Sequence, residues 1–244
     1  MLPQYCVVCL HAIDSKNLYF QFNLCDACSR LLPWAIPGCR RCQQTLPQFD
    51  DIDVNLAPRV CGHCLRQPPL FSELKTVFYY SYPVNHLVRA LKFKRRLAVA
   101  RFLGLLMAER IATQQTHVEA IIPVPLHPVR LAERGFNQAF EIARTIVQRH
   151  PHLNLLDQGV ERLTPTPAQS GLNAQQRFDN MKNVFITRGK FQYRHVAIVD
   201  DVVSTMATVN SLAACLLKTG VATVNVWCAC RNLPREVIHR NALN

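Results

Sequence analysis

Short apolar runs, each rich in β-branched or aromatic residues, recur along the chain after its first third. They cover residues 77–82, 120–123, 153–156, 196–199 and 222–230. Runs of this length, bounded by proline, glycine or polar residues, are typical of β-strands. We expect the aromatic run at 77–82 to lie at the edge of a sheet. The run at 120–123 should stop by Pro123, because proline cannot donate to a strand ladder.

Amphipathic stretches follow three of these runs and predict helices. Pro83 opens a stretch in which apolar residues recur at broadly helical spacing as far as Met107. The same spacing holds over residues 142–147 and 209–217. Strands that alternate with helices in this way predict an α/β fold, in which helices flank a parallel sheet.

The stretch 196–208 places chemically active side chains directly after a predicted strand. Two adjacent carboxylates, Asp200 and Asp201, follow the apolar run where we expect the strand to end. A turn with three hydroxyl side chains comes next, before the predicted helix: Ser204, Thr205 and Thr208. Unpaired amides and the positive dipole at such a helix start suit a phosphate. Adjacent carboxylates can hold two ribose hydroxyls or a hydrated Mg2+.

A second set of candidate anion contacts follows the strand predicted at 120–123. The loop after that strand is stiffened by proline and contains His127. Further along, Arg134, Asn137 and Gln138 put hydrogen-bond donors near the start of the next predicted helix. An ordinary loop with a helix cap is the alternative interpretation of these residues.

A long polar loop or hairpin is predicted between the strand at 153–156 and the acidic pair. It covers residues 162–171, contains two prolines, and is followed by Arg177 and Asn180. Long loops in compact domains often serve as lids or binding loops.

Eight of the eleven cysteines form four Cys-x-x-Cys pairs near the N-terminus. The pairs are Cys6/Cys9, Cys25/Cys28, Cys39/Cys42 and Cys61/Cys64. A two-residue spacer lets both thiolates face one metal, and two pairs complete a tetrahedral zinc site. We therefore expect two structural zinc ions, with an iron–sulfur cluster or redox dithiols as the alternatives. Sequential pairing and a cross-braced pairing use the same ligands, and both remain open at this stage.

The charge of the chain favours a polyanionic partner. The 244 residues carry a formal net charge of +12, which favours nucleic acid or phosphorylated small molecules. The densest basic cluster is Lys92, Lys94, Arg95 and Arg96. We expect this cluster to contact nucleic acid or pyrophosphate. The alternative is that its side chains only form the solvated face of a helix or turn.

Nothing in the sequence predicts a membrane protein. No apolar run reaches the length of about 20 residues that a membrane helix needs. The N-terminus lacks a charged start followed by an apolar block, so we expect no signal peptide and a cytoplasmic protein.

The acidic pair and the hydroxyl-rich turn resemble the signature of the type I phosphoribosyltransferases. The resemblance implies that Asp200 and Asp201 contact the ribose of phosphoribosyl pyrophosphate (PRPP). The loop that would cradle its 5-phosphate is Ser204, Thr205, Met206, Ala207 and Thr208. Met206 departs from the pattern, which has glycine at this position. The resemblance also places His127 in the pyrophosphate loop, and Arg134 and Lys92 where they could neutralise the leaving group.

The order of motifs along nearly the whole chain resembles the ComF family, most closely its GntX-like branch. The motifs are the cysteine pairs, Pro-Val-Pro-Leu-His-Pro, Arg-Gly-Phe-Asn-Gln, Thr-Pro-x-Gln and the Asp-Asp strand. Membership implies a cysteine-rich double zinc-ribbon module, expected at residues 1–68. A phosphoribosyltransferase-like domain should follow at 69–244.

The resemblance also implies a role in DNA uptake during competence or in the use of external DNA as a nutrient. The favoured hypothesis is binding of single-stranded DNA and PRPP, with Mg2+ accompanying PRPP and with uptake-machinery proteins as further partners. The alternatives are a PRPP-dependent transferase with an unknown acceptor and a non-catalytic scaffold with an impaired phosphate loop. Whether the protein is an enzyme stays open.

Overall fold

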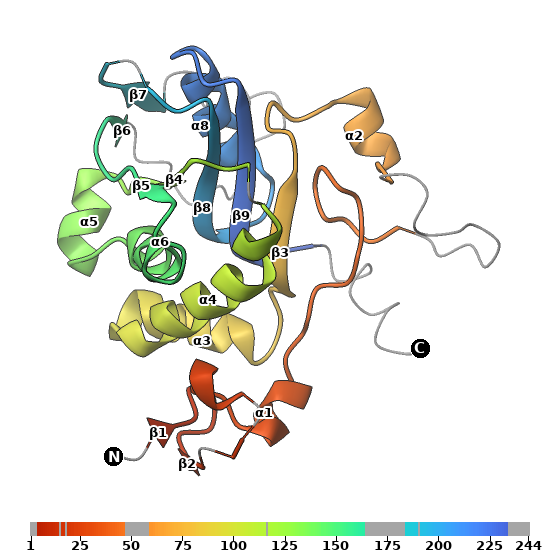
Figure 1. Ribbon diagram of the computed structural model, residues 1–244, viewed down its shortest axis with the longest axis vertical. Coiled ribbons are helices and arrows are strands. Elements are labelled where there is room, and N and C mark those ends of the chain that lie inside the picture. Colours follow the sequence, from red (N-terminus) through yellow and green to blue (C-terminus); the bar gives the residue numbers. More distant parts are fainter. Residues whose placement is uncertain are drawn as a thin grey trace.

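The centre of the protein is a five-stranded sheet in which all neighbouring strands are parallel (Figure 1). The computed structural model describes residues 4–14, 16–17, 19–46, 59–115, 117–163, 184–189 and 191–233. In sheet order the strands are β3 (Leu74–Tyr79), β9 (Thr223–Arg231), β8 (His195–Val203), β4 (Ala120–Pro123) and β5 (Asn154–Leu155). Most of the loop predicted at 162–171, and the downstream Arg177 and Asn180, lie outside the described residues.

All five predicted strands are present, and one of them ends later than the sequence pattern predicts. β3 lies at the sheet edge and β4 stops at Pro123, as predicted. The prediction that the central strand ends at the acidic pair is wrong, because β8 continues through both carboxylates to Val203. Its neighbour β9 keeps pairing with it there, with Asp200 opposite Cys228. That pairing satisfies the backbone, so the carboxylates sit within the strand.

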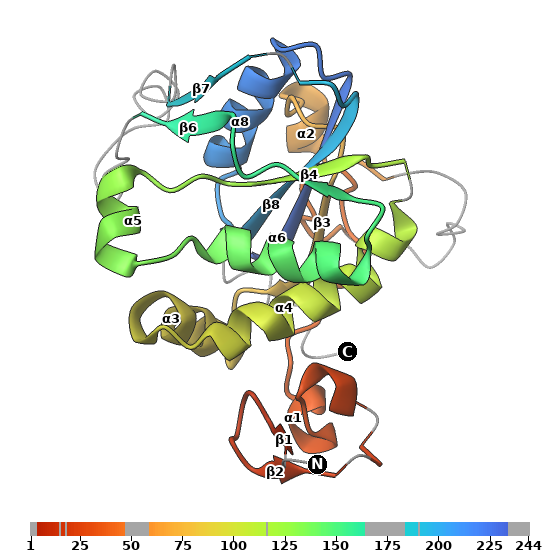
Figure 2. The same cartoon turned by 60° about the vertical axis from the view of Figure 1, so that its left-hand side comes forward.

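Helices cover both faces of the sheet (Figures 1 and 2). One face carries α3 (Val84–Lys94), α4 (Leu97–Arg110) and α6 (Gln138–Arg149), and the other carries α8 (Ala207–Leu217). Alternate residues of β8 serve the two layers: Ala197 and Val199 pack towards α4 and α6, whereas Val196 and Ile198 pack towards α8. This is the side-chain alternation of a strand buried on both faces.

The single helical stretch predicted from Pro83 to Met107 is two helices. Arg95 has φ 52 and ψ 33, the left-handed conformation, which a right-handed helix cannot continue. α3 therefore ends at Lys94 and α4 begins at Leu97. The basic cluster predicted along one helical stretch lies at this break.

The smaller elements lie around this core. They are β1 (Gln4–Tyr5), β2 (Ala12–Ile13), η1 (Phe20–Phe22), α1 (Asp26–Arg30), α2 (Gly62–Arg66), η2 (Ala112–Gln114), α5 (Pro128–Arg134), β6 (Val160–Arg162) and β7 (Phe185–Thr187). β6 and β7 pair antiparallel in a separate two-stranded sheet. In both cartoon views α1 lies at one end of the molecule, beyond α3 and α4, whereas α2 lies towards the other end. Within the described part of the chain, every helix falls short of the apolar length needed to span a membrane.

Candidate functional site

A small hollow opens where β8 passes into α8. Its volume is about 40 Å³. The lining residues are Asp200, Val202, Val203, Ser204, Thr205, Met206, Ala207, Thr208 and Val209. The phosphate loop predicted from the sequence, residues 204–208, therefore lines the same hollow as Asp200, the first carboxylate of the acidic pair. The first amides of α8 are at this end of the helix, where they lack partners within the helix and carry its positive dipole.

Met206 takes the backbone conformation that glycine adopts most readily. It is the N-cap of α8, with φ 65 and ψ −4. A side chain in this left-handed region costs roughly 1–2 kcal/mol. Methionine in place of the glycine of the family pattern therefore strains the backbone of the loop next to the hollow.

The two carboxylates of the acidic pair point to different neighbours, as adjacent residues of a strand do. Asp201 is 2% exposed and faces α3 and α6. Its Oδ2 lies 2.6 Å from Lys92 Nζ, and its Oδ1 accepts a hydrogen bond of 3.1 Å from Gln138 Nε2. Asp200 is 9% exposed, and its Oδ1 accepts a hydrogen bond of 2.9 Å from the Asp201 amide.

Burial and neighbouring charges give these groups unusual acidities. Burial, strengthened by the charge of Asp201, raises the pKa of Asp200 to about 8. Burial alone would lower the pKa of Lys92, but Asp201 and then Asp200 favour its charged form, and its pKa ends above the ordinary value. Burial therefore favours the protonated form of Asp200, whereas the two carboxyl groups favour the charged form of Lys92.

Arg162 is a further charged residue close to the acidic pair, and the sequence singled it out only as the start of a loop. It ends β6, and its guanidinium lies 5.6 Å from the Phe185 ring centroid. Burial lowers the pKa of Arg162, and the nearby charge of Asp200 opposes that effect. No local pattern in the sequence predicts that the β6–β7 strand pair approaches the acidic pair of β8.

The Arg-Gly-Phe-Asn-Gln motif reaches the acidic pair through its last residue. An Arg134 guanidinium nitrogen donates to Gln138 Oε1, and Gln138 in turn donates to Asp201. Asn137 caps α6 by accepting from the Ala139 amide at 2.9 Å, and its Nδ2 donates to Val124 O at 3.0 Å. The motif therefore combines a helix cap with an anchor that joins the start of α6 to the end of β4.

His127 caps α5 in this structure. Its Nδ1 accepts a hydrogen bond of 3.3 Å from the Val129 amide, and α5 is seven residues long. It lies in the loop between β4 and α5. A contact with pyrophosphate stays a prediction.

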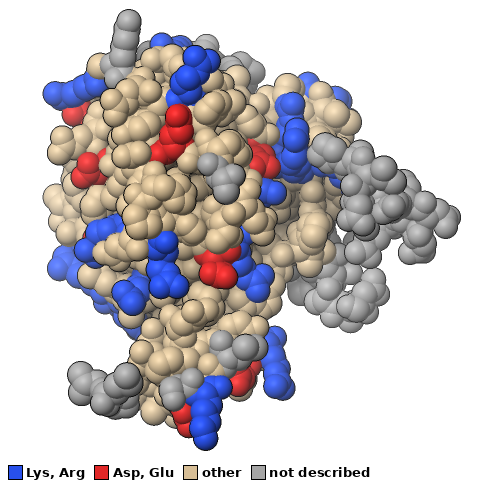
Figure 3. Space-filling view, in the orientation of Figure 1, with Lys and Arg blue, Asp and Glu red and all other residues tan. Residues whose placement is uncertain are grey.

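The four residues of the predicted basic cluster have separate surroundings. Lys92 points inward to Asp201, and Arg96 donates to Val7 O at 3.2 Å. Lys94 and Arg95 are exposed at the end of α3. Figure 3 shows Lys and Arg side chains gathered over the lower left of the main body, the region of α3, α4 and α5 in Figure 1.

An exposed row of residues runs along α3 beside Lys94 and Arg95. Tyr82, His86, Arg89 and Phe93 follow one another at intervals of four, three and four residues, and all four are exposed. Tyr82 and Phe93 are 67% and 76% exposed. The Tyr82 and His86 rings meet edge to face with centroids 5.4 Å apart. We call this row the α3 stripe; the sequence analysis missed it because the exposure of apolar residues depends on the packing of α3.

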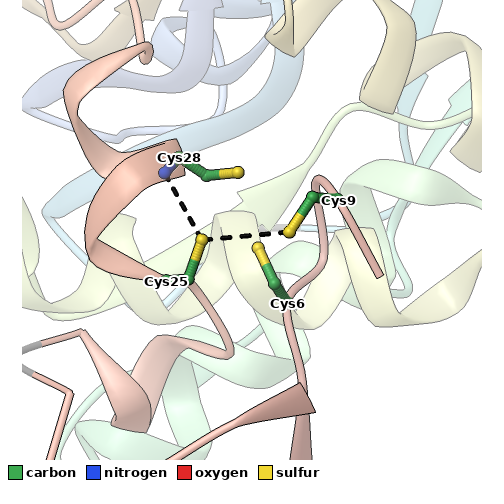
Figure 4. Close-up of side chains that lie close together, drawn as sticks. All are labelled: Cys6, Cys9, Cys25 and Cys28. Carbon is green, nitrogen blue, oxygen red and sulfur yellow. Dashed lines mark hydrogen bonds between the residues drawn. The ribbon is translucent and has the colours of Figure 1, made fainter. Parts of the chain in front are cut away.

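Eight of the eleven cysteines form two groups of four in sequential pairing, which resolves the alternative left open by the sequence. The first group is Cys6, Cys9, Cys25 and Cys28 (Figure 4), and the second is Cys39, Cys42, Cys61 and Cys64. Within each group all sulfur atoms lie within 4.8 Å of one another. The Cys9–Cys25 and Cys42–Cys61 sulfur distances are 3.8 and 3.6 Å. Tetrahedral zinc with bonds of about 2.3 Å would separate its sulfur ligands by about 3.8 Å.

Backbone amides support both cysteine groups. The Cys28 amide lies 3.4 Å from Cys25 Sγ, and the Cys64 amide lies 3.5 Å from Cys61 Sγ in the same arrangement. N–H donors directed at sulfur stabilise thiolates, the form that binds metal. Donor type, distances and sequential spacing therefore fit a metal ion such as Zn2+ in each group.

The parallel sheet flanked by helices makes this an α/β protein with a phosphoribosyltransferase-like sheet, here accompanied by two four-cysteine groups. No family model matches the chain. It is 33% identical over 230 residues to competence protein F of Haemophilus influenzae, covering 90% of this chain and 94% of that protein. It is 36% identical over 217 residues to DNA utilization protein YhgH of Escherichia coli K12, covering 87% and 92% respectively. The chain belongs to the ComF family.

A more distant relative extends the comparison. Competence protein ComFC of Streptococcus pneumoniae is 24% identical over 153 residues, which cover 63% of this chain and 66% of that protein.

Proposed function

We propose that this protein binds PRPP in the hollow at the start of α8 and single-stranded DNA along the α3 stripe, and acts in DNA uptake or in the use of external DNA. The observation that carries the proposal is the meeting of Asp200, the first carboxylate of the acidic pair, and the residues 204–208 loop in one hollow. The names competence protein F and DNA utilization protein, given to relatives that align over most of their length, support the DNA role.

Three sets of groups would bind the three parts of PRPP: the 5-phosphate, the ribose and the pyrophosphate. The amides and hydroxyls of the 204–208 loop would hold the 5-phosphate, because a helix N-terminus favours an anion. Asp200 and Asp201 would accept hydrogen bonds from the ribose hydroxyls. Lys92 contacts Asp201 directly, and Arg134 is linked to Asp201 through Gln138. Together with Mg2+, these two cations would neutralise the pyrophosphate.

The α3 stripe offers what single-stranded DNA needs. Its exposed aromatic rings can stack on bases, and Arg89, Lys94 and Arg95 can track the phosphates. Lys92, on the inner side of the same helix, reaches Asp201. A strand bound along the stripe would therefore pass beside the proposed PRPP site.

Both cysteine groups would hold Zn2+ as structural ions. Four thiolates fill a tetrahedral shell and leave no open position for a reacting water. The cytoplasmic location and the contact with uptake-machinery proteins, both expected from the sequence, stay predictions.

Calorimetric titration with PRPP and Mg2+ tests the PRPP part of the proposal. Wild-type protein should show saturable binding that is lost in Asp200→Asn/Asp201→Asn. The control is Glu119→Gln, which neutralises one carboxylate at the opposite ends of the strands, where Glu119 accepts from the Arg194 and His195 amides. Absence of binding by folded wild-type protein would overturn the PRPP assignment and favour the scaffold alternative. Release of pyrophosphate on addition of an acceptor would establish the transferase alternative.

Fluorescence anisotropy with a labelled single-stranded oligonucleotide tests the DNA part. Phe93→Ala should weaken binding about fivefold to a hundredfold, the value of one lost stacking contact. The control is Tyr5→Ala, which removes another exposed aromatic ring, 54% exposed, from the region of the first cysteine group. Affinity should also fall steeply with salt. An equal effect of the two substitutions, or affinity independent of salt, would refute the stripe as the DNA surface.

A further inference from the structure

Arg231 joins the second cysteine group to the proposed phosphate loop. It ends β9 and is 5% exposed. Its Nε donates to Cys42 O at 2.8 Å, and its Nη1 donates to Val203 O at 2.8 Å and also to Ser204 O. The planar guanidinium presents donors in fixed directions, so one side chain sets the distance between the 39–42 turn and the end of β8.

Other contacts join the same two regions. The Met206 side chain packs against the four cysteines of the second group, together with Leu46 and Val60. Beyond Cys64, the Leu70 amide donates to the Asn210 side-chain oxygen in α8 at 2.7 Å. The second cysteine group therefore supports the loop through Arg231 on one side and through Met206 on the other.

The loop needs such support from outside. Residues 204 and 205 lie between the end of β8 and the start of α8, and Met206 joins α8 by its carbonyl, which accepts from the Asn210 amide at 2.8 Å. Met206 adds an unfavourable backbone conformation, which persists where surrounding contacts fix it. A buried guanidinium that lost its acceptor at Cys42 would carry unsatisfied donors, so the turn and the loop should be displaced together.

The first cysteine group has a different neighbour, which makes it a natural control. Its Val7 carbonyl accepts from Arg96 Nη2, and Phe22 lies in the same core cluster as residues of α4. The two groups are otherwise closely matched. Cys25 and Cys61 each cap a five-residue helix and accept from the amide of the cysteine three residues later.

We propose that metal bound in the second cysteine group controls phosphate binding by the 204–208 loop. Arg231 is the positioning residue, because it links the metal-bound turn to residues 203–206. Metal bound by the second group holds the 39–42 turn against the loop, and loss of that metal releases the loop. This inference rests on the proposed function for its ligand, and its structural part can be measured without one.

The test compares Cys64→Ser with Cys28→Ser, two substitutions at equivalent positions of the two groups. Each should lose one equivalent of zinc by metal analysis. Amide hydrogen exchange of the peptide covering residues 203–209 should be at least tenfold faster in Cys64→Ser and unchanged in Cys28→Ser. PRPP affinity should fall at least tenfold in Cys64→Ser and stay within twofold of wild type in Cys28→Ser. Unchanged exchange in Cys64→Ser, or equal acceleration in both variants, would overturn the inference.

Arg231→Lys keeps the inference testable if Cys64→Ser fails to fold. This variant keeps the positive charge and both zinc ions but loses the planar fork, so it should accelerate exchange of 203–209 and weaken PRPP binding. Wild-type exchange and affinity in Arg231→Lys would refute the positioning role. If wild-type protein bound no PRPP while the exchange pattern appeared as expected, the proposed ligand would be wrong and the coupling between metal and loop would stand.

Discussion

At the scale of single residues, the candidate site holds two groups in states that cost free energy. Met206 occupies the left-handed backbone region, and Asp200 is a carboxyl group buried beside a second carboxylate. Neither state is favourable for an isolated residue, and the surrounding fold imposes both. Strained backbone and perturbed pKa values cluster at functional sites, so their meeting at one hollow supports the choice of this place as the candidate site.

The strain at Met206 can be measured by comparing two substitutions. Met206→Ala and Met206→Gly both remove the side chain, but only glycine adopts φ 65 without a steric penalty. Met206→Gly should therefore have the larger free energy of unfolding, by about 1 kcal/mol after the entropy of glycine in the unfolded chain is included. Urea denaturation of both variants gives this difference, and an alanine variant as stable as the glycine variant would contradict it.

Asp200 should make stability depend on pH. Its folded pKa of about 8 exceeds the ordinary value of 3.8, so between these limits the folded protein holds a proton that the unfolded chain has released. The contribution of Asp200 to the free energy of unfolding should therefore fall as pH rises through this window, by up to about 1.4 kcal/mol per pH unit, and level off above pH 8.

Asp200→Asn is the matched variant for this pH effect, because asparagine can still accept from the Asp201 amide. Urea unfolding of both proteins from pH 5.5 to 8.5 should show the stability difference moving in favour of asparagine as pH rises. A difference that stays constant over this range would show that Asp200 titrates near its ordinary pKa.

At the scale of elements, the break between α3 and α4 separates the functions of neighbouring residues. Lys92 faces the acidic pair, Phe93 faces solvent, and Arg96 reaches the segment of the first cysteine group. α4 can then pack against α6 at close range, because Gly104 leaves room for Thr145. A Cβ at position 104 would lie 2.6 Å from Thr145 Cβ.

Gly104→Ala should therefore destabilise the protein although alanine favours helices. Separating the two helices should lower the free energy of unfolding by about 1–3 kcal/mol, the usual range for an overpacked core. Gly62→Ala in α2 is the control, since a Cβ there would meet only Arg66 Nη1, at 3.4 Å. Equal denaturation midpoints for the two variants would refute the close packing of α4 on α6.

At the scale of the whole molecule, the basic residues that give the net charge of +12 include two sets with different surroundings. Lys92 and Arg134 lie at the buried acidic pair, whereas Lys94 and Arg95 extend the exposed α3 stripe. The two proposed ligands therefore draw on different basic residues, although both sets lie around one helix.

Lys94→Ala/Arg95→Ala should weaken binding of single-stranded DNA and leave PRPP binding unchanged. Lys16→Ala/Lys75→Ala is the charge-matched control, and its smaller effect on DNA would exclude a simple dependence on net charge. Anisotropy and calorimetry on the same preparations provide the two affinities. Equal loss of both affinities in the first variant would show that the surfaces are not separate.

The sequence by itself determined the parts of this protein that depend on neighbouring residues. Apolar spacing located the five strands, the Cys-x-x-Cys spacing indicated two four-cysteine sites, and the residues 200–208 indicated an acidic pair before a turn. These features can be predicted from the sequence because hydrophobic periodicity, helix caps and the spacing of metal ligands depend on residues close together in the chain.

Only the tertiary structure decided which distant groups meet. It paired Lys92 with Asp201, exposed Phe93, assigned the cysteines sequentially to two groups, and brought Arg231 to Cys42, 189 residues away in the chain. It also extended β8 through the acidic pair, because β9 pairs with it there. Such contacts depend on how packed layers bring remote segments together, and no local pattern encodes the distance between them.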